Sequence, residues 1–368
     1  CYPMPMTRVI GVLNAGSSSL KAAFSDASAD APAFWRETIE LDADAPDHET
    51  ALADLLDAFA KRHADAELAA VGHRIVHGGP SFAAPARVDA AVLAEIERLV
   101  PLAPQHQPHG LAAIRALRAQ RPDLLQVACF DTAFHRTQDP RSERFPLPTA
   151  LHDAGVRRYG FHGLSYESIA AQLPGVLGDA GEGRVVVAHL GNGASLAALR
   201  ARRCVSTTMG LTPLDGLMMG TRAGAIDPGV LLHLIREEGY DEARLSHLLQ
   251  AESGLLGVSG ISHDMRDLLA SDAPEARFAV ALFVQRLVQE IASMAAALDG
   301  VDALVFTGGI GEHAAPVREA ACTRLAWLGL DLDAAANRAD GPRLTRPDSR
   351  DSAWVLSLIH ISDHTILQ

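Results

Sequence analysis

Several short stretches of the chain combine glycine, hydroxyl, amide and cationic residues in a way that suits phosphate binding. The stretch 14–21 reads Asn-Ala-Gly-Ser-Ser-Ser-Leu-Lys. Glycine lets the backbone approach a ligand, N–H and O–H groups bond phosphate oxygens, and a lysine adds a point charge. A Walker A spacing is absent. The stretch therefore predicts a polyphosphate contact through Ser17, Ser19 and Lys21, with a polar surface hairpin as the alternative.

Two further glycine turns, at 189–193 and 306–313, each follow an apolar run of strand length. The second also contains Gly309, Gly311 and Ala314 with Asp331 some twenty residues later, which imitates a dinucleotide fingerprint. That match alone is weak, because ordinary tight turns share these glycines. Three separate turns favour a nucleotide held between two lobes over a single Rossmann unit.

Two arginines lie among apolar and glycine residues with few acids nearby, namely Arg74 and Arg222. Their planar guanidinium groups match carboxylate and phosphate oxygens, although a structural ion pair is the alternative for each. Asp131 ends a buried strand and could orient Mg²⁺ on phosphates, or could be a cap or turn residue. His162 could stabilise negative charge, or could be structural. The histidines show no metal-binding spacing.

The elements that would position these residues alternate between strands and helices. Strands are predicted at 8–13, 20–24, 68–76, 124–130, 185–188, 196–199, 303–306 and 353–356. Helices are predicted at 50–62 with Thr50 as cap, at 90–99 and 110–119, in the 230s and 240s, and at 274–298. This alternation predicts an α/β protein with ligands at the carboxyl ends of its strands.

The two halves of the chain look alike. The distance from Asn14 to Asp131 nearly equals that from Gly191 to Thr307, and each half opens with a strand, a glycine turn and a second strand. We therefore predict an internal duplication with two similar lobes. The expected domains are 1–135 and 136–356.

Composition narrows the functional classes. The chain has 368 residues, of which 48% are hydrophobic and 21% charged, and its net charge is -13. These values exclude general disorder and disfavour a nucleic-acid partner. The longest apolar stretch, 278–298, contains Gln, Arg and Glu, which predicts a core helix and no membrane partner. Four widely spaced cysteines are predicted to be free thiols in a reducing, cytoplasmic compartment.

Both ends depart from the pattern. Five residues precede Met6, the expected natural start, and 357–368 lack Glu, Lys and Arg. We expect residues 1–5 and 357–368 to be non-native.

Seven motifs in order give the chain a resemblance to the acetokinase (acetate kinase) family, within the actin-like ATPase and sugar kinase superfamily. They are NAGSSSLK at Asn14, GHRIVHGG at Gly72, FDTAFH at Phe130, RRYGFHG at Arg157, HLGNGAS at His189, TPLDGLMMGTRAGAIDP at Thr212 and FTGGIGE at Phe306. The resemblance implies two lobes of the ribonuclease H-like type with a nucleotide cleft between them. It also implies reversible, Mg²⁺-dependent transfer of the γ-phosphoryl group of ATP to acetate in a cytoplasmic homodimer.

By the same resemblance, Asp131 is the catalytic carboxylate, and His162 and Arg222 stabilise the transition state. Arg74 binds the carboxylate substrate, and Val76, Phe161 and Pro213 wall the acyl pocket. Asn14 helps to hold Mg²⁺. Besides Lys21, Ser17 and Ser19, the residues implied in ATP binding are His189, Leu190, Gly191, Asn192, Gly193, Asp264, Met265, Arg266, Gly309, Ile310, Gly311, Glu312 and His313.

The chain departs from the family pattern at three points. Gln105 replaces an apolar pocket residue, and His313 replaces an asparagine. The family's Pro-Thr-Asp/Asn-Glu-Glu motif, one Glu of which binds Mg²⁺, is replaced from Ser357 onward by Ser-Leu-Ile-His-Ile. We therefore expect nucleotide binding with reduced turnover and stability, and a faster rate once a family-like tail is restored.

Three alternatives remain open beside acetate kinase. One is a propionate or butyrate kinase of the same family. Another is an NAD-dependent oxidoreductase built on the Gly309–Ala314 stretch. The last is a catalytically impaired nucleotide-binding clamp.

Overall fold

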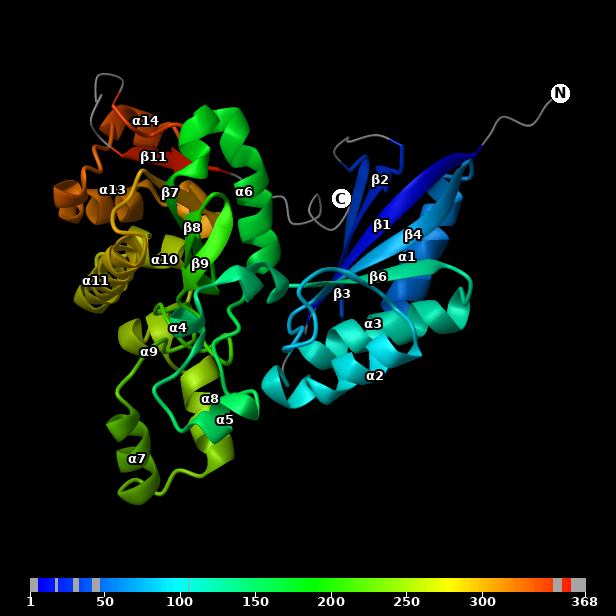
Figure 1. The fold of residues 1–368 in the computed structure, drawn as a ribbon, viewed down its shortest axis with the longest axis horizontal. Coiled ribbons are helices and arrows are strands. Elements are labelled where there is room, and N and C mark those ends of the chain that lie inside the picture. Colours follow the sequence, from blue (N-terminus) through cyan, green and yellow to red (C-terminus); the bar gives the residue numbers. More distant parts are fainter. Residues whose placement is uncertain are drawn as a thin grey trace. The chain divides into compact units, whose positions relative to one another are not determined.

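The computed structural model describes residues 6–16, 19–28, 33–41, 47–104, 106–346 and 353–358 (Figure 1). The chain divides into two compact units. The described residues up to Phe134 form the first unit, and those from His135 to Leu358 form the second.

The first unit is built on a mixed sheet. Its described strands are, in spatial order, β3 (Trp35–Glu40), β2 (Ser19–Asp26), β1 (Thr7–Ala15), β4 (Ala66–Ile75), β6 (Leu125–Phe130) and β5 (Ala86–Arg87). β1, β2 and β3 form an antiparallel meander, whereas β4 runs parallel to β1, and β6 runs parallel to β4. The carboxyl ends of β1, β4 and β6 therefore share one edge of the sheet.

Three described helices pack in the first unit, and one of them contacts the turn that follows β1. They are α1 (His48–Arg62), α2 (Ala90–Arg98) and α3 (Gln107–Gln120). α1 and α3 contact each other and the strands, and in the core the ring of Phe24 stacks on those of Trp35 and Phe59, with centroids 4.9 and 4.7 Å away. This packing places His48, the first residue of α1, so that its Nε2 lies 2.8 Å from the carbonyl oxygen of Gly16.

The second unit has its own mixed sheet. Its described strands are, in spatial order, β11 (Trp354–Ser357), β10 (Ala303–Thr307), β7 (Arg184–Leu190), β8 (Ala194–Arg200) and β9 (Arg203–Thr207). β7, β8 and β9 form an antiparallel meander, and β10 and β11 continue the sheet in parallel with β7. β7 and β10 are almost wholly buried, so they appear in sequence as continuous apolar runs.

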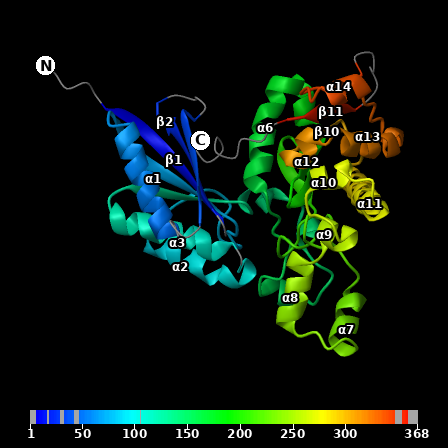
Figure 2. The same cartoon turned by 180° about the vertical axis from the view of Figure 1, so that it is seen from behind.

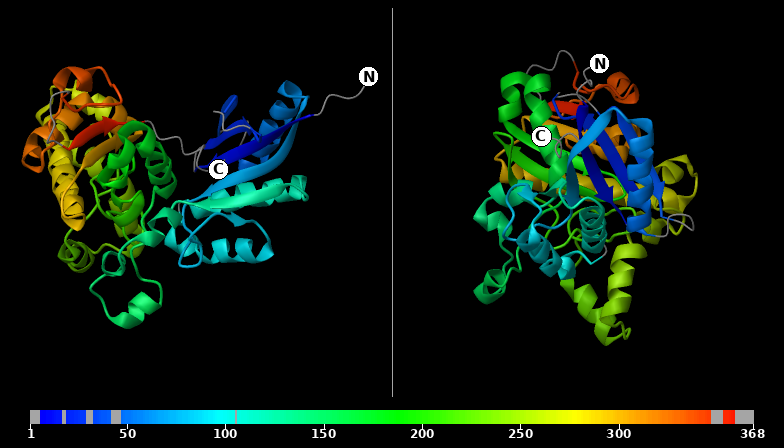
Figure 3. Two further views of the ribbon diagram at one scale, coloured as in Figure 1. Left: turned by 45° about the horizontal axis from the view of Figure 1, so that its top comes forward. Right: turned by 90° about the vertical axis from the view of Figure 1, so that its right-hand side faces the viewer.

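Helices flank this second sheet on two sides, and Figures 1 and 3 show α6 and α11 on opposite faces. The helices are α4 (Pro140–Glu143), α5 (Thr149–Asp153), α6 (Gly163–Leu177), α7 (Pro228–Arg236), α8 (Glu242–Ala251), α9 (Gly254–Ser259), α10 (Met265–Ala270), α11 (Pro274–Ala297), α12 (Gly308–His313), α13 (Ala315–Arg324) and α14 (Ala334–Arg338). Figure 2 shows α7 and α8 extending away from the sheet of their unit. Short 3-10 segments lie at Val100–Leu102, Ala133–Thr137, Gly178–Glu182 and Ala326–Leu328.

Within the described residues, α11 is the helix that is long and apolar enough to cross a membrane by length and composition alone. It contacts β7, β8 and β9 of its own unit, and Phe283, Leu287 and Ile291 on its inner face are buried. α11 is thus the core helix that its interrupted apolar pattern predicts.

Five described strands of each sheet share one topology, in which an antiparallel meander is followed by two strands parallel to its first member, and the first sheet adds β5 antiparallel to β6. This agrees with the predicted similarity of the lobes. The two nearly equal spacings, however, do not join equivalent strands. Asp131 follows β6, the second parallel strand, whereas Thr307 ends β10, the first parallel strand.

Several predicted boundaries differ from the observed ones because caps and turns extend the elements. Asp47, and not Thr50, caps α1, and its carboxylate accepts from the backbone N–H of Thr50. Pro108 lies inside the first turn of α3, where its missing N–H costs nothing. The glycines at 308, 309 and 311, predicted to form a tight turn, belong to the helical turn α12.

Candidate active site

Three of the predicted site residues meet at the carboxyl edge of the first sheet. Asn14 lies near the end of β1, Arg74 lies near the end of β4, and Asp131 follows β6 directly. The parallel registers set Leu13 beside His73 and Arg74 beside Cys129, so the three polar side chains emerge together.

Arg74 bonds both of the other residues. Its Nη2 donates to Oδ2 of Asp131 at 2.7 Å, its Nε lies 3.2 Å from the same oxygen, and its Nη1 donates to Oδ1 of Asn14 at 3.4 Å. The Asp131 side chain is 3% exposed, whereas that of Arg74 is 30% exposed. The negative charge of Asp131 raises the pKa of Arg74, although burial opposes this shift. Arg74 is therefore a fixed cation that keeps part of its surface open to a second anion.

The alternative reading of Arg74 as a member of an ion pair is thus realised, with Asp131 as the partner. Both members are predicted site residues. The pair supplies charge compensation for a carboxylate that is otherwise out of contact with water.

The loop that follows β4 is held by two residues that no sequence motif singles out. Gln107 of α3 accepts from the backbone N–H of His77 at 3.1 Å and donates to its carbonyl oxygen at 2.8 Å. Thr132 accepts from the backbone N–H of Gly78 at 2.9 Å. Both act across large sequence separations, so no local pattern announces them.

The predicted phosphate turn lies at the tip of the β1–β2 hairpin. Lys21 is exposed and pairs in register with Asn14, and Gly16 N–H donates to the carbonyl oxygen of Ser19 at 2.8 Å. Lys21 and Asn14 therefore belong to one local group. Ser17 lies outside the described residues.

His162 is held in the second unit in an uncommon backbone conformation. It precedes α6 with φ 60° and ψ 20°, in the left-handed region that non-glycine residues rarely adopt. Its Nδ1 lies 2.8 Å from Oγ of Ser195, and its ring lies 4.3 Å from that of His189. Strain of this kind persists where surrounding contacts fix the side chain.

Arg222 and His162 converge on Gly193. A Cβ placed on Gly193 would lie 2.6 Å from Nη2 of Arg222 and 3.3 Å from Nε2 of His162. Arg222 donates to the carbonyl oxygen of Pro213 at 2.6 Å and forms no ion pair with a described residue. Burial lowers its pKa. The Arg222 guanidinium and Nε2 of His162 thus lie on the same side of the β7–β8 loop, at Gly193.

A cavity of about 410 Å³ in the second unit collects the predicted nucleotide-binding segments. Its lining residues are Gly191, Asn192, His263, Asp264, Met265, Arg266, Leu269, Gly309, Ile310, His313 and Ala314. The structure therefore brings together three segments that lie far apart in sequence. His263 and Leu269 were not predicted as binding residues, although each lies close in sequence to one that was, and Ala314 entered only through the dinucleotide-like stretch Gly309–Ala314.

Of the residues of the second unit that are predicted to bind nucleotide, five do not line this cavity. Leu190 is fully buried in β7, and Gly193 faces Arg222 and His162. Nδ1 of His189 lies 2.9 Å from Oγ of Ser165. The other two are Gly311, whose carbonyl oxygen bonds Arg318, and Glu312, whose carboxylate accepts from Gly308 N–H.

Two helices that line the cavity, α10 and α12, are fixed by hydrogen bonds of their own. Asp264 caps α10 through the N–H of Arg266, and hydrogen bonds from Arg266 lower its pKa to about 2. Behind α12, the buried Arg318 donates to the carbonyl oxygen of Gly311 at 2.9 Å and to Oδ1 of Asn337 at 2.7 Å. Hydrogen bonds from residues behind α12 and at the start of α10 therefore fix the positions of both helices that line the cavity.

The residues predicted to form the acyl pocket are divided between the units. Val76 is half-buried in the first unit, whereas Phe161 and Pro213 belong to the second. Phe161 is buried, and its carbonyl oxygen lies 2.8 Å from Nε2 of His135. Gln105, the departure from the family pattern in this pocket, lies outside the described residues.

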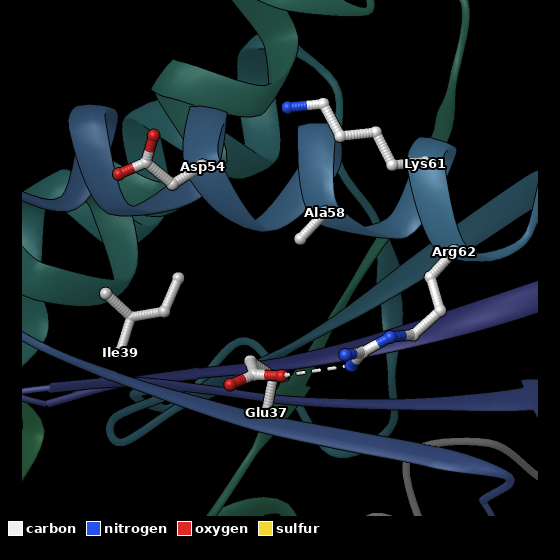
Figure 4. Close-up of a pocket in the computed structure, with 6 residues that line it drawn as sticks. All are labelled: Glu37, Ile39, Asp54, Ala58, Lys61 and Arg62. Atoms are coloured by element: carbon white, nitrogen blue, oxygen red, sulfur yellow. Dashed lines mark ion pairs between the residues drawn. The ribbon is translucent and has the colours of Figure 1, made fainter.

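A second cavity, of about 600 Å³, lies between β3 and α1 in the first unit (Figure 4). It is lined by Glu37, Ile39, Asp54, Ala58, Lys61 and Arg62. Arg62 and Glu37 face each other across it at 3.9 Å. None of the predicted site residues belongs to it, so it is separate from the candidate site.

No group of three or more His, Cys, Asp or Glu residues within the described part of the chain could hold a metal ion. Oδ1 of Asn14 and the carboxylate of Asp131 both accept from Arg74, and they are hard oxygen donors of the kind that Mg²⁺ takes together with substrate phosphates.

Known structures share this fold closely. A propionate kinase from Francisella tularensis superimposes with a TM-score of 0.91 at 33% identity, and an acetate kinase from Porphyromonas gingivalis with 0.87 at 34%; 98% of each chain is covered in both cases. The protein is therefore a kinase of the actin-like ATPase fold.

Sequence comparison defines the family. An acetate kinase from Rhodopseudomonas palustris is 48% identical over 378 residues, with 95% of each chain covered. The acetokinase family model matches residues 9–364. The chain belongs to the acetokinase family.

Proposed function

We propose that the protein is an acetate kinase that reversibly transfers the γ-phosphoryl group of ATP to acetate, giving acetyl phosphate and ADP, with Mg²⁺. The observation that carries this proposal is the arrangement around the Gly191–Gly193 loop. On one side, Gly191 and Asn192 line a nucleotide-sized cavity, and on the other, Gly193 faces Arg222 and His162. A nucleotide in that cavity would direct its phosphates toward two positive or hydrogen-donating groups.

The chemistry requires alignment and charge compensation more than a strong base. A carboxylate substrate is already ionised, so it can attack the γ-phosphorus directly. In the proposed mechanism Arg74 binds this carboxylate. Arg222 and His162 donate to the equatorial phosphoryl oxygens, where charge accumulates during transfer. Asp131 fixes Arg74 and completes the charge balance.

We propose that Asn14 and Asp131 hold Mg²⁺ jointly with the nucleotide phosphates. Their oxygens are already gathered by Arg74, and hard oxygen ligands suit this ion. When bound, Mg²⁺ neutralises charge on the β- and γ-phosphates. Lys21, exposed at the tip of the adjacent hairpin, adds a further cation for the same phosphates.

Trapping of acyl phosphate with hydroxylamine tests the proposal directly. We expect hydroxamate to form only when ATP, Mg²⁺ and acetate are all present. ATP binding without hydroxamate would support the nucleotide-binding clamp, and a fluorescence response to reduced nicotinamide cofactor would support the oxidoreductase. Either result would overturn the assignment.

We propose acetate as the substrate in preference to propionate and butyrate. The same assay compares the three carboxylates. The similarity to a propionate kinase makes propionate the most informative competitor. Higher kcat/KM for propionate than for acetate would reassign the substrate within the same reaction class.

Four further expectations stay predictions that rest on the resemblance. They concern a homodimer, a cytoplasmic location, the domain limits 1–135 and 136–356 with a nucleotide between the lobes, and the effect of the replaced motif after Ser357. Ser357 itself ends β11, and the other residues of the predicted tail, apart from Leu358, lie outside the described residues.

A further inference from the structure

A chain of hydroxyl groups approaches His162 from the side opposite to Gly193. Oγ of Ser195 lies 2.8 Å from Nδ1 of His162 and 2.5 Å from the phenol oxygen of Tyr166. Ser195 and Tyr166 are both fully buried. Ser195 is the second residue of β8 and Gly193 directly precedes this strand, so one short segment bonds Nδ1 through Ser195 and approaches Nε2 at Gly193, where an added Cβ would lie 3.3 Å from that nitrogen.

The hydrogen count along this chain favours one direction. Either oxygen can be the donor in the Tyr166–Ser195 hydrogen bond, and because burial raises the pKa of Tyr166, its phenol keeps the proton that this direction requires. A serine hydroxyl carries one proton, and after accepting from Tyr166 it has that proton left for Nδ1 of His162. Nδ1 is then the acceptor, and the proton of a neutral imidazole lies on Nε2.

The surroundings of Nε2 make this tautomer useful. Nε2 and the Arg222 guanidinium face the same point beside Gly193, and a positive charge so close opposes a second one on the imidazole. A neutral histidine can donate to a phosphoryl oxygen only if its proton is on Nε2. The other neutral tautomer would present a lone pair to an anion.

We propose that Ser195, oriented by Tyr166, is a positioning residue that keeps neutral His162 in the tautomer with its proton on Nε2. This rests on the proposed function, in which His162 donates to the transferring group. Neither Ser195 nor Tyr166 touches the reacting atoms in this proposal. They act through the imidazole.

The packing around Tyr166 supports its part in this arrangement. Its ring meets those of His135 and His189 edge-on, with centroids 5.5 and 6.5 Å away. The phenol therefore has little freedom to turn away from Ser195.

Imidazole NMR of the full chain labelled with ¹⁵N-histidine tests the tautomer directly, at about pH 8, where histidine is ordinarily neutral. The signals of His162 are identified by their loss in His162→Gln. We expect the wild type to show the proton on Nε2, and Ser195→Ala to show a mixed or reversed pattern. Ser195→Thr, which keeps a hydroxyl, should restore the wild-type pattern, and Ser206→Ala, a buried serine on the neighbouring strand, should not alter it.

Kinetics provide the second measurement. Ser195→Ala should lower kcat roughly ten- to a hundredfold while KM for ATP and acetate changes little, because a donor effective in the transition state is misdirected. Tyr166→Phe should give a smaller loss in kcat and the same direction of change in the NMR pattern. Tyr159→Phe is the matched control, since it removes a buried phenol that donates to Gly155 at 3.0 Å.

A proton on Nδ1 in the wild type overturns the proposal. So does Ser195→Ala with an unchanged tautomer and kcat within twofold of wild type. Should Ser195→Ala fail to fold, Tyr166→Phe carries the test, with the wild-type chain and Tyr159→Phe as its comparisons. Because the NMR pattern needs no turnover, absence of acyl phosphate in the wild type would refute the proposed function and leave the positioning test intact.

Discussion

At the scale of single residues, the charge of Arg74 explains how the carboxylate of Asp131 can be buried at the candidate site. Asp131 is almost inaccessible to water, and a carboxylate in that position is stable only beside a cation. Arg74 provides it through two nitrogens and keeps an open face. Arg222 differs from Arg74 in its partners, because it is partly buried, donates to a carbonyl oxygen and forms no ion pair with a described residue, which suits the role proposed for it toward an anion that arrives with the substrate.

These different surroundings predict different kinetic defects. Arg74→Ala should chiefly raise KM for acetate, by about tenfold or more, because it removes the cation proposed to bind the carboxylate. Arg222→Ala should chiefly lower kcat, by roughly a hundredfold, with little change in KM. Steady-state kinetics with varied acetate and ATP separate the two. Arg115→Ala, which removes a surface ion pair with Glu97, is the control for general effects, and the reverse pattern would exchange the two roles.

At the scale of elements, the site depends on where strands end and on how closely turns can approach side chains. Asn14, Arg74 and Asp131 meet because three neighbouring parallel strands end at one edge. The loop between β7 and β8 meets Arg222 and His162 because Gly193 has no side chain.

Gly193→Ala should therefore damage catalysis out of proportion to its size. Its Cβ would lie 2.6 Å from Nη2 of Arg222, closer than such atoms approach in proteins, so Arg222 would be displaced. We expect kcat to fall at least roughly tenfold, since small displacements of reacting groups are costly.

The matched control is Gly175→Ala in α6, where a Cβ would meet no atom within 4 Å. It should keep full activity and should leave stability unchanged or raise it by up to about 1 kcal/mol. Equal kcat in the two variants would contradict the proposed role of the β7–β8 loop.

The stability of the folded protein should depend on pH through His73, a buried histidine of β4. His73, next to Arg74 on this strand, is buried against Gln126 at 2.9 Å, and burial lowers its pKa from 6.5 to about 4. Between pH 6.5 and about 4, His73 is therefore protonated in the unfolded chain and neutral in the folded chain. Stability should fall as pH drops from about 6.5 toward 4, by up to roughly 3 kcal/mol from this residue.

Urea unfolding at several pH values measures this effect. His73→Gln should be less stable than wild type at neutral pH but should lose less stability on acidification. His247→Gln, which alters an exposed histidine of α8, should keep the wild-type pH dependence. An unchanged pH dependence in His73→Gln would show that His73 is not the titrating group.

The sequence predicts the central strands well, but it predicts the ends of the helices poorly. Buried parallel strands such as β6 and β10 are nearly continuous apolar runs, which few other structures produce. Ends depend on a single cap or turn, so Asp47 and Pro108 shifted the predicted helix starts. Gln107 and Ser195 escaped assignment because their roles arise from contacts with residues distant in sequence.

At the scale of the whole molecule, two units of one topology carry different chemistry. The first holds a carboxylate, an arginine and an amide at its sheet edge, and the second holds the nucleotide-sized cavity with His162 and Arg222. The alternation of strands and helices was enough to predict two similar lobes. Equal spacing along the chain was not enough to match their strands, because the loops between equivalent strands differ in length.

This division predicts that nucleotide affinity and phosphoryl transfer can be separated by substitution. Asp131→Asn removes the charge that balances Arg74 while keeping the shape of the side chain, so turnover should fall by roughly a thousandfold or more. ATP binding in the absence of Mg²⁺, measured by calorimetry, should change less than threefold, since no residue of the first unit lines the cavity.

The converse substitution alters the cavity and leaves the charged group intact. Ile310→Trp should fill part of the 410 Å³ space and weaken ATP binding strongly, whereas its effect on the pairing of Arg74 with Asp131 should be nil. If Asp131→Asn abolished ATP binding as completely as Ile310→Trp does, the two units could not have the separate duties proposed for them. The assignment of nucleotide binding to the second unit would then have to be abandoned.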